Sequence, residues 1–547
     1  MTIANLNIAW LLPEILILTM ACVILVIDAY LPKQLRNLTY HLTQGTLLGA
    51  ALLIIAANPM QPILAMNDMV IIDAMSVVLK LFIVLIVFFT FIYSREYLQD
   101  RKIFKGEYFV LGLFATLGML IMVSAHNLLM VFLGLELLSL SLYAMIAMNR
   151  DSKVATEAAM KYFVLGALAS GMLLYGMSML YGITATLDLT KLSQSVSEIS
   201  NDRIVISSVN QLISETEEVE LAIKNVEKHV TTITNSPIAT KIAEIIEANI
   251  ETDAMVIIKP MLASSSQNYT ILVFGLVFIV IGVAFKLGAV PFHSWIPDVY
   301  HGSPTSMTLF VASAPKIAAF AMVIRMLVDG MQTLHTDWQG MLILLSILSI
   351  IVGNIIAIAQ QNIKRMLAYS TIAHVGYLLL GIIAANADGY AASMFYVVVY
   401  TIMTLGAFGM IILLSRTGFE ADKIEDFKGL NERNPWYAMI MLIIMLSMAG
   451  VPPMVGFWAK WAVLAQVINA GFVWLAVLAV LFAVIGAFYY LRIVKLMYFD
   501  KPTSLVPIEA GVDMRFALSA NALIVLLLGL MPNTLMAICL GAWGISV

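Results

Sequence analysis

The chain has 547 residues, of which 61% are hydrophobic and only 12% are charged. A soluble domain carries about 25% charged residues, so the composition excludes an ordinary soluble protein. The net charge of −4 says little, because it mostly reflects one polar segment described below, and no nucleic-acid partner is expected. Apolar runs of about 18 residues or more recur along the chain, which predicts a polytopic membrane protein.

In chain order, these runs predict an all-α fold of about fourteen transmembrane helices, since a helix needs about 20 residues to cross a bilayer. They are expected near residues 8–29, 41–57, 71–93, 107–124, 127–148, 155–182, 270–291, 305–328, 339–359, 366–384, 390–415, 435–467, 472–498 and 514–536. Basic residues follow helices one, three, five, nine, eleven and thirteen, whereas none occurs in the short connections 58–70, 329–338, 385–389 and 468–471. Because basic connections stay in the cytoplasm, both termini are expected on the outer side.

Residues 184–268 interrupt this pattern with a polar segment that is more acidic than basic. Apolar residues recur at helical spacing near 219–230 and 238–250, which predicts two short amphipathic helices outside the membrane. The segment is either a docking surface for another subunit or a family-specific decoration.

Lys286 lies in the stretch VAFKLGAVPFHSWIPDVY (283–300), deep in an apolar run that Pro291 then breaks. An ionisable side chain at membrane depth costs roughly 2.5–3.5 kcal/mol on insertion scales, which makes Lys286 a functional candidate. The alternative is a lysine whose ammonium group reaches the lipid headgroups near a helix end.

The same pattern recurs within residues 441–466, where Pro452 and Pro453 break a second apolar run and Lys460 follows the break. Two interrupted segments in matching places predict internal repeats with a functional site in each. The repeats would be helices four to eight and nine to thirteen, and their odd helix number requires them to be inverted. The expected divisions are 1–106 (helices one to three), 107–330 (first repeat, with the 184–268 insert), 331–500 (second repeat) and 501–547 (helix fourteen).

Two further ionisable residues lie inside the predicted bundle. Glu136, in the middle of helix five, needs a partner or water because burying an unpaired carboxylate is costly. Lys316 lies in helix eight, directly after Pro315, which predicts a backbone irregularity there. Burial weakens a lysine's hold on its proton and a nearby carboxylate strengthens it. Together with the two lysines above, these residues predict a proton pathway.

Four more residues are candidates with structural alternatives. Glu157 and Lys161 are four residues apart on helix six and can pair along one face. His293 follows the first break and would relay protons towards the cytoplasm, whereas His374 would lie between the two lysine sites. An isolated histidine on a helix face is more often structural, so both interpretations stay open.

The sequence gives no sign of a redox or nucleotide site. It contains no CxxC pair, no P-loop and no GxGxxG motif after a strand. Its seven histidines do not form the pairs on two helices that would hold a haem. We therefore expect no cofactor and no metal in this chain, and the energy that moves protons must come from elsewhere.

Five stretches carry a resemblance to a known family. They are LGLELLSL (133–140), EAAMKYF (157–163), FKLGAVPFHSWIPDVYHGSP (285–304), NIKRMLAYSTIAHVGY (362–377) and LSMAGVPPMVGFWAKW (446–461). Over nearly its whole length the chain resembles the antiporter-like membrane subunits of respiratory complex I, most closely the subunit N family of bacterial NADH-quinone oxidoreductase. The resemblance implies fourteen helices with two inverted five-helix repeats, each containing a broken helix.

The resemblance also implies roles for individual residues. The family's helix-five glutamate corresponds to Glu136, its broken-helix lysine to Lys286, its helix-eight lysine to Lys316 and its helix-twelve residue to Lys460. A lysine at the last position separates this chain from a sister subunit that has glutamate there. The implied function is proton translocation, driven by NADH oxidation and quinone reduction in other subunits.

The cofactors implied by the resemblance, namely NADH, FMN, iron–sulfur clusters and quinone, would be bound by partner subunits. The implied partners are the other membrane subunits of complex I, the peripheral redox arm through them, and the lipid bilayer. The location would be the bacterial inner membrane, with both termini on the periplasmic side. The 184–268 segment is longer than the family usually has in that loop.

The main alternative function is a subunit of a multisubunit Na⁺(K⁺)/H⁺ antiporter, which shares the fold and the lysine–glutamate pattern. The sequence LLPEILIL (11–18) and the sequence of helix seven favour complex I. A stand-alone transporter of a small organic solute would need a roomy pocket at the membrane midplane. A purely structural scaffold would not need several interior lysines.

Overall fold

The computed structural model describes residues 6–32, 35–215, 219–230, 236–248, 254–415, 418–502, 508 and 510–545. Among these residues, 13 helices are long and apolar enough to cross a membrane. A further span is built from two shorter helices, α18 (Pro435–Ala449) and α19 (Val455–Asn469). The prediction of about fourteen transmembrane helices is therefore confirmed.

The chain divides into two compact units, a larger one of residues 1–170, 283–324 and 341–547 and a smaller one of residues 171–282 and 325–340. Besides α18 and α19, the elements that lie in or reach into the larger unit are α1 (Leu12–Tyr30), α2 (Asn37–Ala56), β1 (Ile63–Ala65), β2 (Val70–Ile72), α3 (Ala74–Asp100), α4 (Gly106–Val123), α5 (Leu128–Ile146), α6 (Lys153–Thr184), α10 (Ala254–Leu287), α11 (Trp295–Gly302), α12 (Thr305–Ala312), α13 (Ala314–Val323), α14 (His335–Ala359), α15 (Ile363–Ile383), α16 (Ala387–Leu414), α17 (Leu430–Arg433), α20 (Val473–Phe499), α21 (Val512–Leu530) and α22 (Pro532–Gly541). Short 3₁₀ turns lie at Ile8–Leu11, Gln332–Leu334 and Ile424–Phe427, and a π-helical turn lies at Ile324–Asp329.

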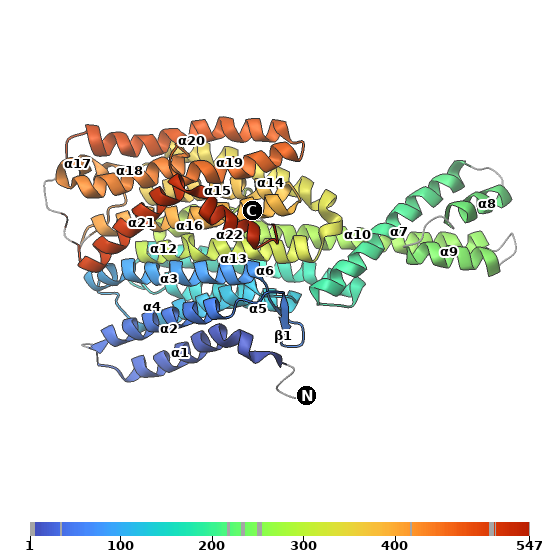
Figure 1. The fold of residues 1–547 in the computed structure, drawn as a ribbon, viewed down its shortest axis with the longest axis horizontal. Coiled ribbons are helices and arrows are strands. Elements are labelled where there is room, and N and C mark those ends of the chain that lie inside the picture. Colours follow the sequence, from blue (N-terminus) through green and yellow to red (C-terminus); the bar gives the residue numbers. More distant parts are fainter. Residues whose placement is uncertain are drawn as a thin grey trace. The chain divides into compact units, whose positions relative to one another are not determined.

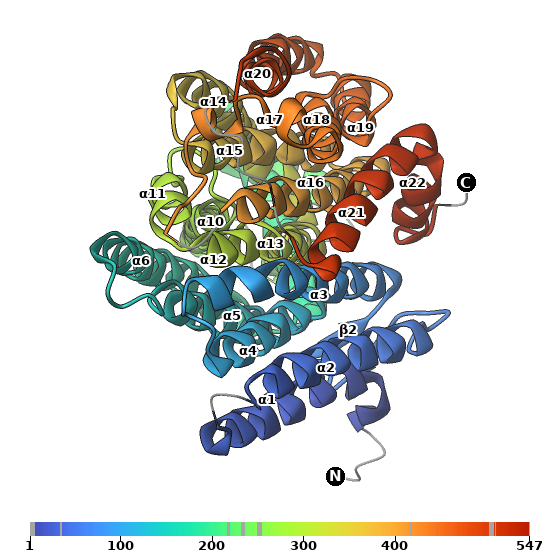
Figure 2. The same cartoon turned by 90° about the vertical axis from the view of Figure 1, so that its left-hand side faces the viewer.

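Helix α16 forms the centre of the larger unit. It packs against α3, α12, α13, α15, α18, α19, α21 and α22, and Figure 2, which looks along the helices, shows its neighbours around it. Its residues from Gly389 to Leu414 are all buried, as expected for a helix that is apolar on every side. In Figure 1, α1 and α2 lie at one edge of this bundle and α20 at the opposite edge.

Both predicted helix breaks are present, and each begins at a glycine. α10 ends at Leu287 before Gly288 at φ +83°, and α18 ends at Ala449 before Gly450 at φ +85°. A left-handed residue closes the last turn of a helix, and glycine adopts this conformation without strain. The expected helix end at residue 291 was therefore wrong, because Gly288 terminates α10 before the proline is reached.

The predicted irregularity beside Pro315 is also present. α12 ends at Ala312, Ser313 has φ −107° and ψ −100°, and α13 then begins with Pro315 at its second position. A proline in the first turn of a helix lacks only a donor that would be unpaired there. Lys316 therefore follows directly from the restart of a helix.

Gly456, in the first turn of α19, brings the two half-helices of the second break together. A Cβ atom at this position would lie 1.9 Å from the backbone oxygen of Ser447 on α18. Because backbone cannot move aside as a side chain can, we expect Gly456→Ala to destabilise the protein by about 1–3 kcal/mol. The measurement is the temperature at which the purified complex loses activity, with Gly171→Ala as control, since a Cβ there meets nothing within 4 Å. An unchanged temperature for Gly456→Ala would contradict the close packing of α18 on α19.

A small β-hairpin differs from the expectation that helix three begins near residue 71. β1 and β2 pair antiparallel, with Ala65 opposite Val70. The turn between them contains Met66, Asn67 and Asp68, all with positive φ. The helix α3 starts only after Asp73, whose carboxylate accepts a hydrogen bond from the backbone N–H of Ser76 at 2.8 Å.

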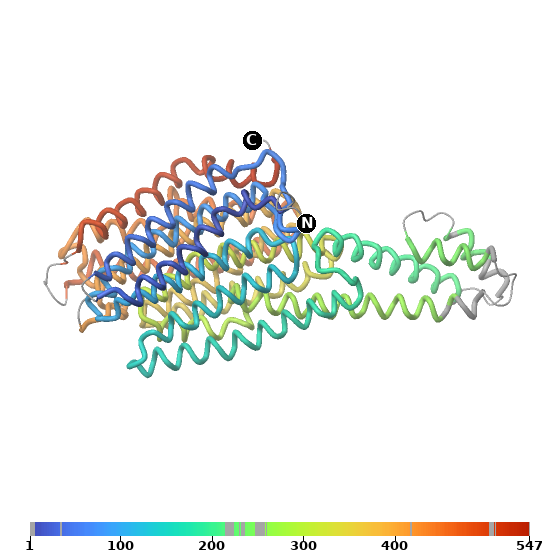
Figure 3. The backbone as a smooth tube through the Cα atoms, turned by 90° about the horizontal axis from the view of Figure 1, so that it is seen from below, coloured from blue at the N-terminus to red at the C-terminus, as the bar shows by residue number. Residues whose placement is uncertain are grey.

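The smaller unit contains the polar segment. Its helices are α7 (Leu189–Glu215), α8 (Val219–Val230), α9 (Pro237–Ala248) and α10 up to residue 282, together with the end of α6 and the start of α14. α8 and α9 confirm the two predicted amphipathic helices, whereas α7 was not predicted. All three fall outside the candidate spans. They pack on one another (Figure 3), around a core that includes Val209, Val226 and Ile242.

Candidate functional site

Lys286 lies in the last turn of α10 and contacts α5. Its Nζ donates a hydrogen bond to the side-chain oxygen of Ser139 at 2.8 Å. Glu136 is three residues before Ser139, so the two side chains are neighbours on α5. The charge of Glu136 acts on Lys286, and its Oε1 is buried without a hydrogen-bond partner among the described residues. Lys286 therefore contacts Ser139 directly and Glu136 through charge.

Lys316 and Lys460 each bind the carbonyl end of a broken helix. Lys316 Nζ donates to the backbone oxygen of Leu287 at 2.8 Å, at the end of α10. Lys460 Nζ donates to the backbone oxygens of Met448 at 3.1 Å and Ala449 at 2.8 Å, at the end of α18. The last carbonyls of a helix lack partners within the helix and carry partial negative charge, which stabilises an ammonium group. Each break thus creates a site for a cation.

Two small cavities flank Lys316. The first, of about 20 Å³, lies between Lys316 and Lys286, and Ser139, Tyr162 and Trp295 also line it. The second, of about 10 Å³, lies between Lys316 and His374, and its other polar lining residues are Tyr396 and Tyr400. A cavity needs about 10–15 Å³ to hold one water molecule, so the first can hold one and the second is at the limit. Lys316 is the residue common to both.

His374 is buried, and both of its ring nitrogens have partners. Nδ1 lies 2.7 Å from Oη of Tyr396, and Nε2 lies 3.1 Å from Oη of Tyr490. The Tyr490 hydroxyl lies in turn 2.5 Å from Oγ of Ser370. Imidazole and hydroxyl groups both donate and accept hydrogen bonds, so these contacts form a continuous chain of exchangeable protons.

Two ring contacts extend from this hydrogen-bonded chain towards Lys460. The ring of Tyr377 stacks on that of Tyr396 at 6.4 Å between centroids, and Lys460 Nζ lies 5.4 Å from the centre of the Tyr377 ring. His374 therefore lies between Lys316 and Lys460. The tyrosines were not predicted from the sequence, because aromatic side chains are common in membrane helices and their hydroxyls give no separate signal.

Glu157 and Lys161 belong to a different cluster, whose members lie on α6, α11 and α15. Lys161 Nζ lies 2.9 Å from Glu157 and 2.8 Å from Asp298, and Asp298 lies 3.0 Å from Arg365. Partial burial opposes the charged form of Asp298, but hydrogen bonds from Lys161 and Arg365 hold its pKa below the ordinary value. Neither Glu157 nor Lys161 lines the two cavities.

His293 lies in the break between α10 and α11. Its Nδ1 is buried without a hydrogen-bond partner among the described residues. It lines neither of the two cavities beside Lys316. The structure therefore brings together Glu136, Lys286, Lys316, His374 and Lys460, and leaves His293, Glu157 and Lys161 outside this group.

Comparisons with known proteins identify the family of this chain. Residues 125–216 and 237–486 match the family described as NADH:quinone oxidoreductase/Mrp antiporter, TM. Subunit N of NADH-quinone oxidoreductase from Thioalkalivibrio sulfidiphilus is 52% identical over 97% of both chains, and that from Thiobacillus denitrificans is 52% identical over 98% of this chain and 97% of the relative. The chain belongs to the subunit N family of NADH-quinone oxidoreductase.

Solved structures extend this family assignment to the fold. A chain of respiratory complex I from Thermus thermophilus is 27% identical, with a TM-score of 0.72 over 96% of this chain and 98% of that one. A chain of the Mrp complex from Dietzia has a TM-score of 0.76 over 100% of this chain and 97% of its own, but at 17% identity it shows a common fold alone. The fold is thus that of the antiporter-like membrane subunits of complex I.

The family match is interrupted within the polar segment of residues 184–268, because it leaves out residues 217–236. That this segment is longer than the family usually has stays a prediction.

Proposed function

We propose that this chain is the proton-translocating membrane subunit of its oxidoreductase, with protons passing between Lys286, Lys316 and Lys460. The observation that carries the proposal is that Lys316 lines both cavities and so faces Lys286 on one side and His374 on the other. A lysine with a water-sized space on each side can receive a proton from one and release it to the other.

Glu136 and Lys286 would form the loading end of this path. A nearby carboxylate stabilises the ammonium form of a lysine, whereas burial favours the neutral amine. A change in the separation of the two groups therefore changes how tightly Lys286 holds its proton. Ser139, which already accepts the Lys286 hydrogen bond, keeps the side chain at the edge of the first cavity.

The ends of the broken helices would hold protons at the next two sites of the path, Lys316 and Lys460. The carbonyls of Leu287 and Ala449 stabilise ammonium groups on Lys316 and Lys460 in an interior that offers little water. Between these stations the proton would pass through His374 and its tyrosine partners. In this proposal Glu157, Lys161 and His293 also take part in proton transfer, although they line neither of the two cavities.

Other subunits would supply the driving energy. In this proposal they bind NADH, FMN, iron–sulfur clusters and quinone, whereas this chain binds none of these and no metal. The direct partners would be the other membrane subunits, the surrounding lipid, and through the subunits the peripheral redox arm. Basic residues occur in the connections that follow α1, α3, α5 and α16, among them Arg36, Lys105, Arg150 and Lys428. These connections would lie in the cytoplasm, and both termini would then lie on the periplasmic side of the bacterial inner membrane.

The test is affinity purification of the tagged chain in mild detergent, followed by reconstitution into vesicles. We expect flavin, iron–sulfur subunits and NADH:quinone activity to purify with the chain, and the vesicles to acidify when NADH is oxidised. A complex that lacks redox subunits and exchanges Na⁺ for H⁺ would instead assign the same residues to an antiporter.

A further inference from the structure

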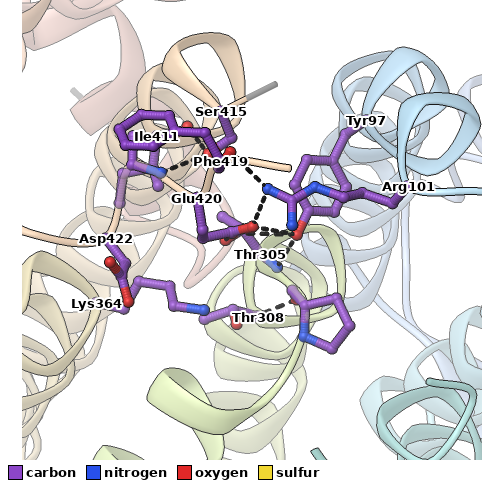
Figure 4. Close-up of polar contacts among 12 residues, drawn as sticks. Tyr97, Arg101, Thr305, Thr308, Lys364, Ile411, Ser415, Phe419, Glu420 and Asp422 are labelled. Atoms are coloured by element: carbon purple, nitrogen blue, oxygen red, sulfur yellow. Dashed lines mark hydrogen bonds and ion pairs between the residues drawn. The ribbon is translucent and has the colours of Figure 1, made fainter. Parts of the chain in front are cut away.

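Glu420 is the centre of a polar cluster at one end of the larger unit (Figure 4). Its carboxylate pairs with Arg101 and accepts hydrogen bonds from the hydroxyls of Tyr97, at 3.0 and 3.1 Å, and of Thr305. The Tyr97 hydroxyl in turn accepts a hydrogen bond from the backbone N–H of Thr305 at 3.1 Å. A charged carboxylate only accepts hydrogen bonds, so three donors from two other elements fix its position. This cluster is not part of the proposed proton path.

Glu420 lies in a segment that links α16 to α17 and that we call the strap (residues 418–429). The strap is tied to helices of the predicted second repeat. Ile363 at the start of α15 donates its backbone N–H to the oxygen of Asp422 at 2.7 Å, and Gly429 donates to Leu496 on α20 at 3.0 Å. The strap is therefore attached to the second repeat, and also to the end of α3, where Arg101 donates to the backbone oxygen of Phe419 at 2.8 Å. Thr305, in contrast, belongs to the first repeat.

Thr305 is the first residue of α12, which leads through the irregularity at Ser313 into α13 and Lys316. A negative charge at a helix N-terminus is favourable because the first N–H groups point towards it. A second contact holds the same part of the chain, because Lys364 on α15 donates a hydrogen bond to the backbone oxygen of Ser303 at 3.0 Å. The start of α12, which leads into α13 and Lys316, is thus held by two elements of the predicted second repeat.

We propose that Glu420 is a positioning residue, which fixes the start of α12 and thereby the place of Lys316 between its two cavities. The proposal rests on the proposed proton path, because it concerns how one station of that path is held. Under this proposal, the strap is the contact through which the second repeat controls Lys316 in the first repeat. Loss of the carboxylate would free the N-terminus of α12. This would change the position of Lys316 relative to the backbone oxygen of Leu287.

The experiment uses the complete complex in vesicles and measures protons pumped per NADH oxidised, so that the amount of complex cancels. We expect Glu420→Ala to lower this ratio about tenfold, since a misplacement of about 1 Å can cost up to 10²-fold. Glu420→Gln keeps an oxygen for Thr305 or Tyr97 and should recover much of the ratio. Glu425→Ala is the matched control, because Glu425 is in the same strap with a side chain 73% exposed and pairs with Lys428.

Thr305→Val tests whether Glu420 acts through α12. It should lower the ratio, and the double variant with Glu420→Ala should be no worse than Glu420→Ala alone, because contacting residues that share one role are not additive. If Glu420→Ala fails to assemble, Thr305→Val carries the test. A wild-type ratio in Glu420→Ala or in Thr305→Val would overturn the inference.

Lys316→Ala, measured in parallel, distinguishes a failure of the positioning role of Glu420 from a failure of the proton path. Loss of pumping in Lys316→Ala together with a wild-type ratio in Glu420→Ala would overturn the positioning role and leave the proton path intact. Wild-type pumping in Lys316→Ala would overturn the path itself.

Discussion

Lys286→Ala is expected to lower NADH-driven proton pumping by at least about tenfold, since positioned proton donors and acceptors typically contribute about 10²–10⁴-fold. The side chain lines the first cavity and is the link between Glu136 and Lys316. Its removal leaves the α10 break in place, because Gly288 and not the lysine ends that helix. The complex should therefore assemble while vesicle acidification is lost. Lys495→Ala is the control, since that side chain is 63% exposed on α20.

Glu136→Gln should reproduce most of this loss with a smaller change in shape. The amide keeps the size of the carboxylate and removes the charge that acts on Lys286. Glu425→Gln serves as its control. Wild-type pumping in both Lys286→Ala and Glu136→Gln, with normal yield of the complex, would remove the proposed loading end.

His374→Gln is expected to have the second large effect. A glutamine can still hydrogen-bond to Tyr396 and Tyr490, so the packing around α15 should survive. It cannot take up a proton, so transfer between Lys316 and Lys460 should fall by about 10²-fold or to the passive leak. The measurement is the initial rate of acidification in vesicles that contain equal amounts of complex.

His41→Gln is the matched control for this variant, because His41 is exposed on α2. Normal acidification by His374→Gln would mean that protons bypass the histidine. The interior tyrosines would then serve packing alone.

Much of this site follows from the sequence for a simple physical reason. A lysine within an apolar run is so costly in a bilayer that Lys286, Lys316 and Lys460 stand out without a structure. Prolines beside them marked the breaks, although Gly288 ended α10 before Pro291 was reached. The fold class was equally accessible, because spans of this length and composition have few alternatives.

Other parts depend on contacts between residues distant in sequence. No local pattern links Lys316 to the carbonyl of Leu287, 29 residues earlier. Tyr490 reaches His374 across 116 residues, and Tyr97 reaches Glu420 across 323. The hairpin β1–β2 was missed because two strands of 3 residues give too short a pattern to separate from the following apolar helix.

The most direct test of the central claim is the number of protons pumped per NADH by the assembled complex with Lys316→Arg. Arginine keeps the positive charge and can still donate to the backbone oxygen of Leu287, but it does not release its proton in proteins. We expect normal assembly and NADH oxidation by the redox subunits, together with a loss of pumping as severe as in Lys316→Ala. A wild-type ratio in Lys316→Arg would contradict the account, because Lys316 would then supply charge and not a path for protons.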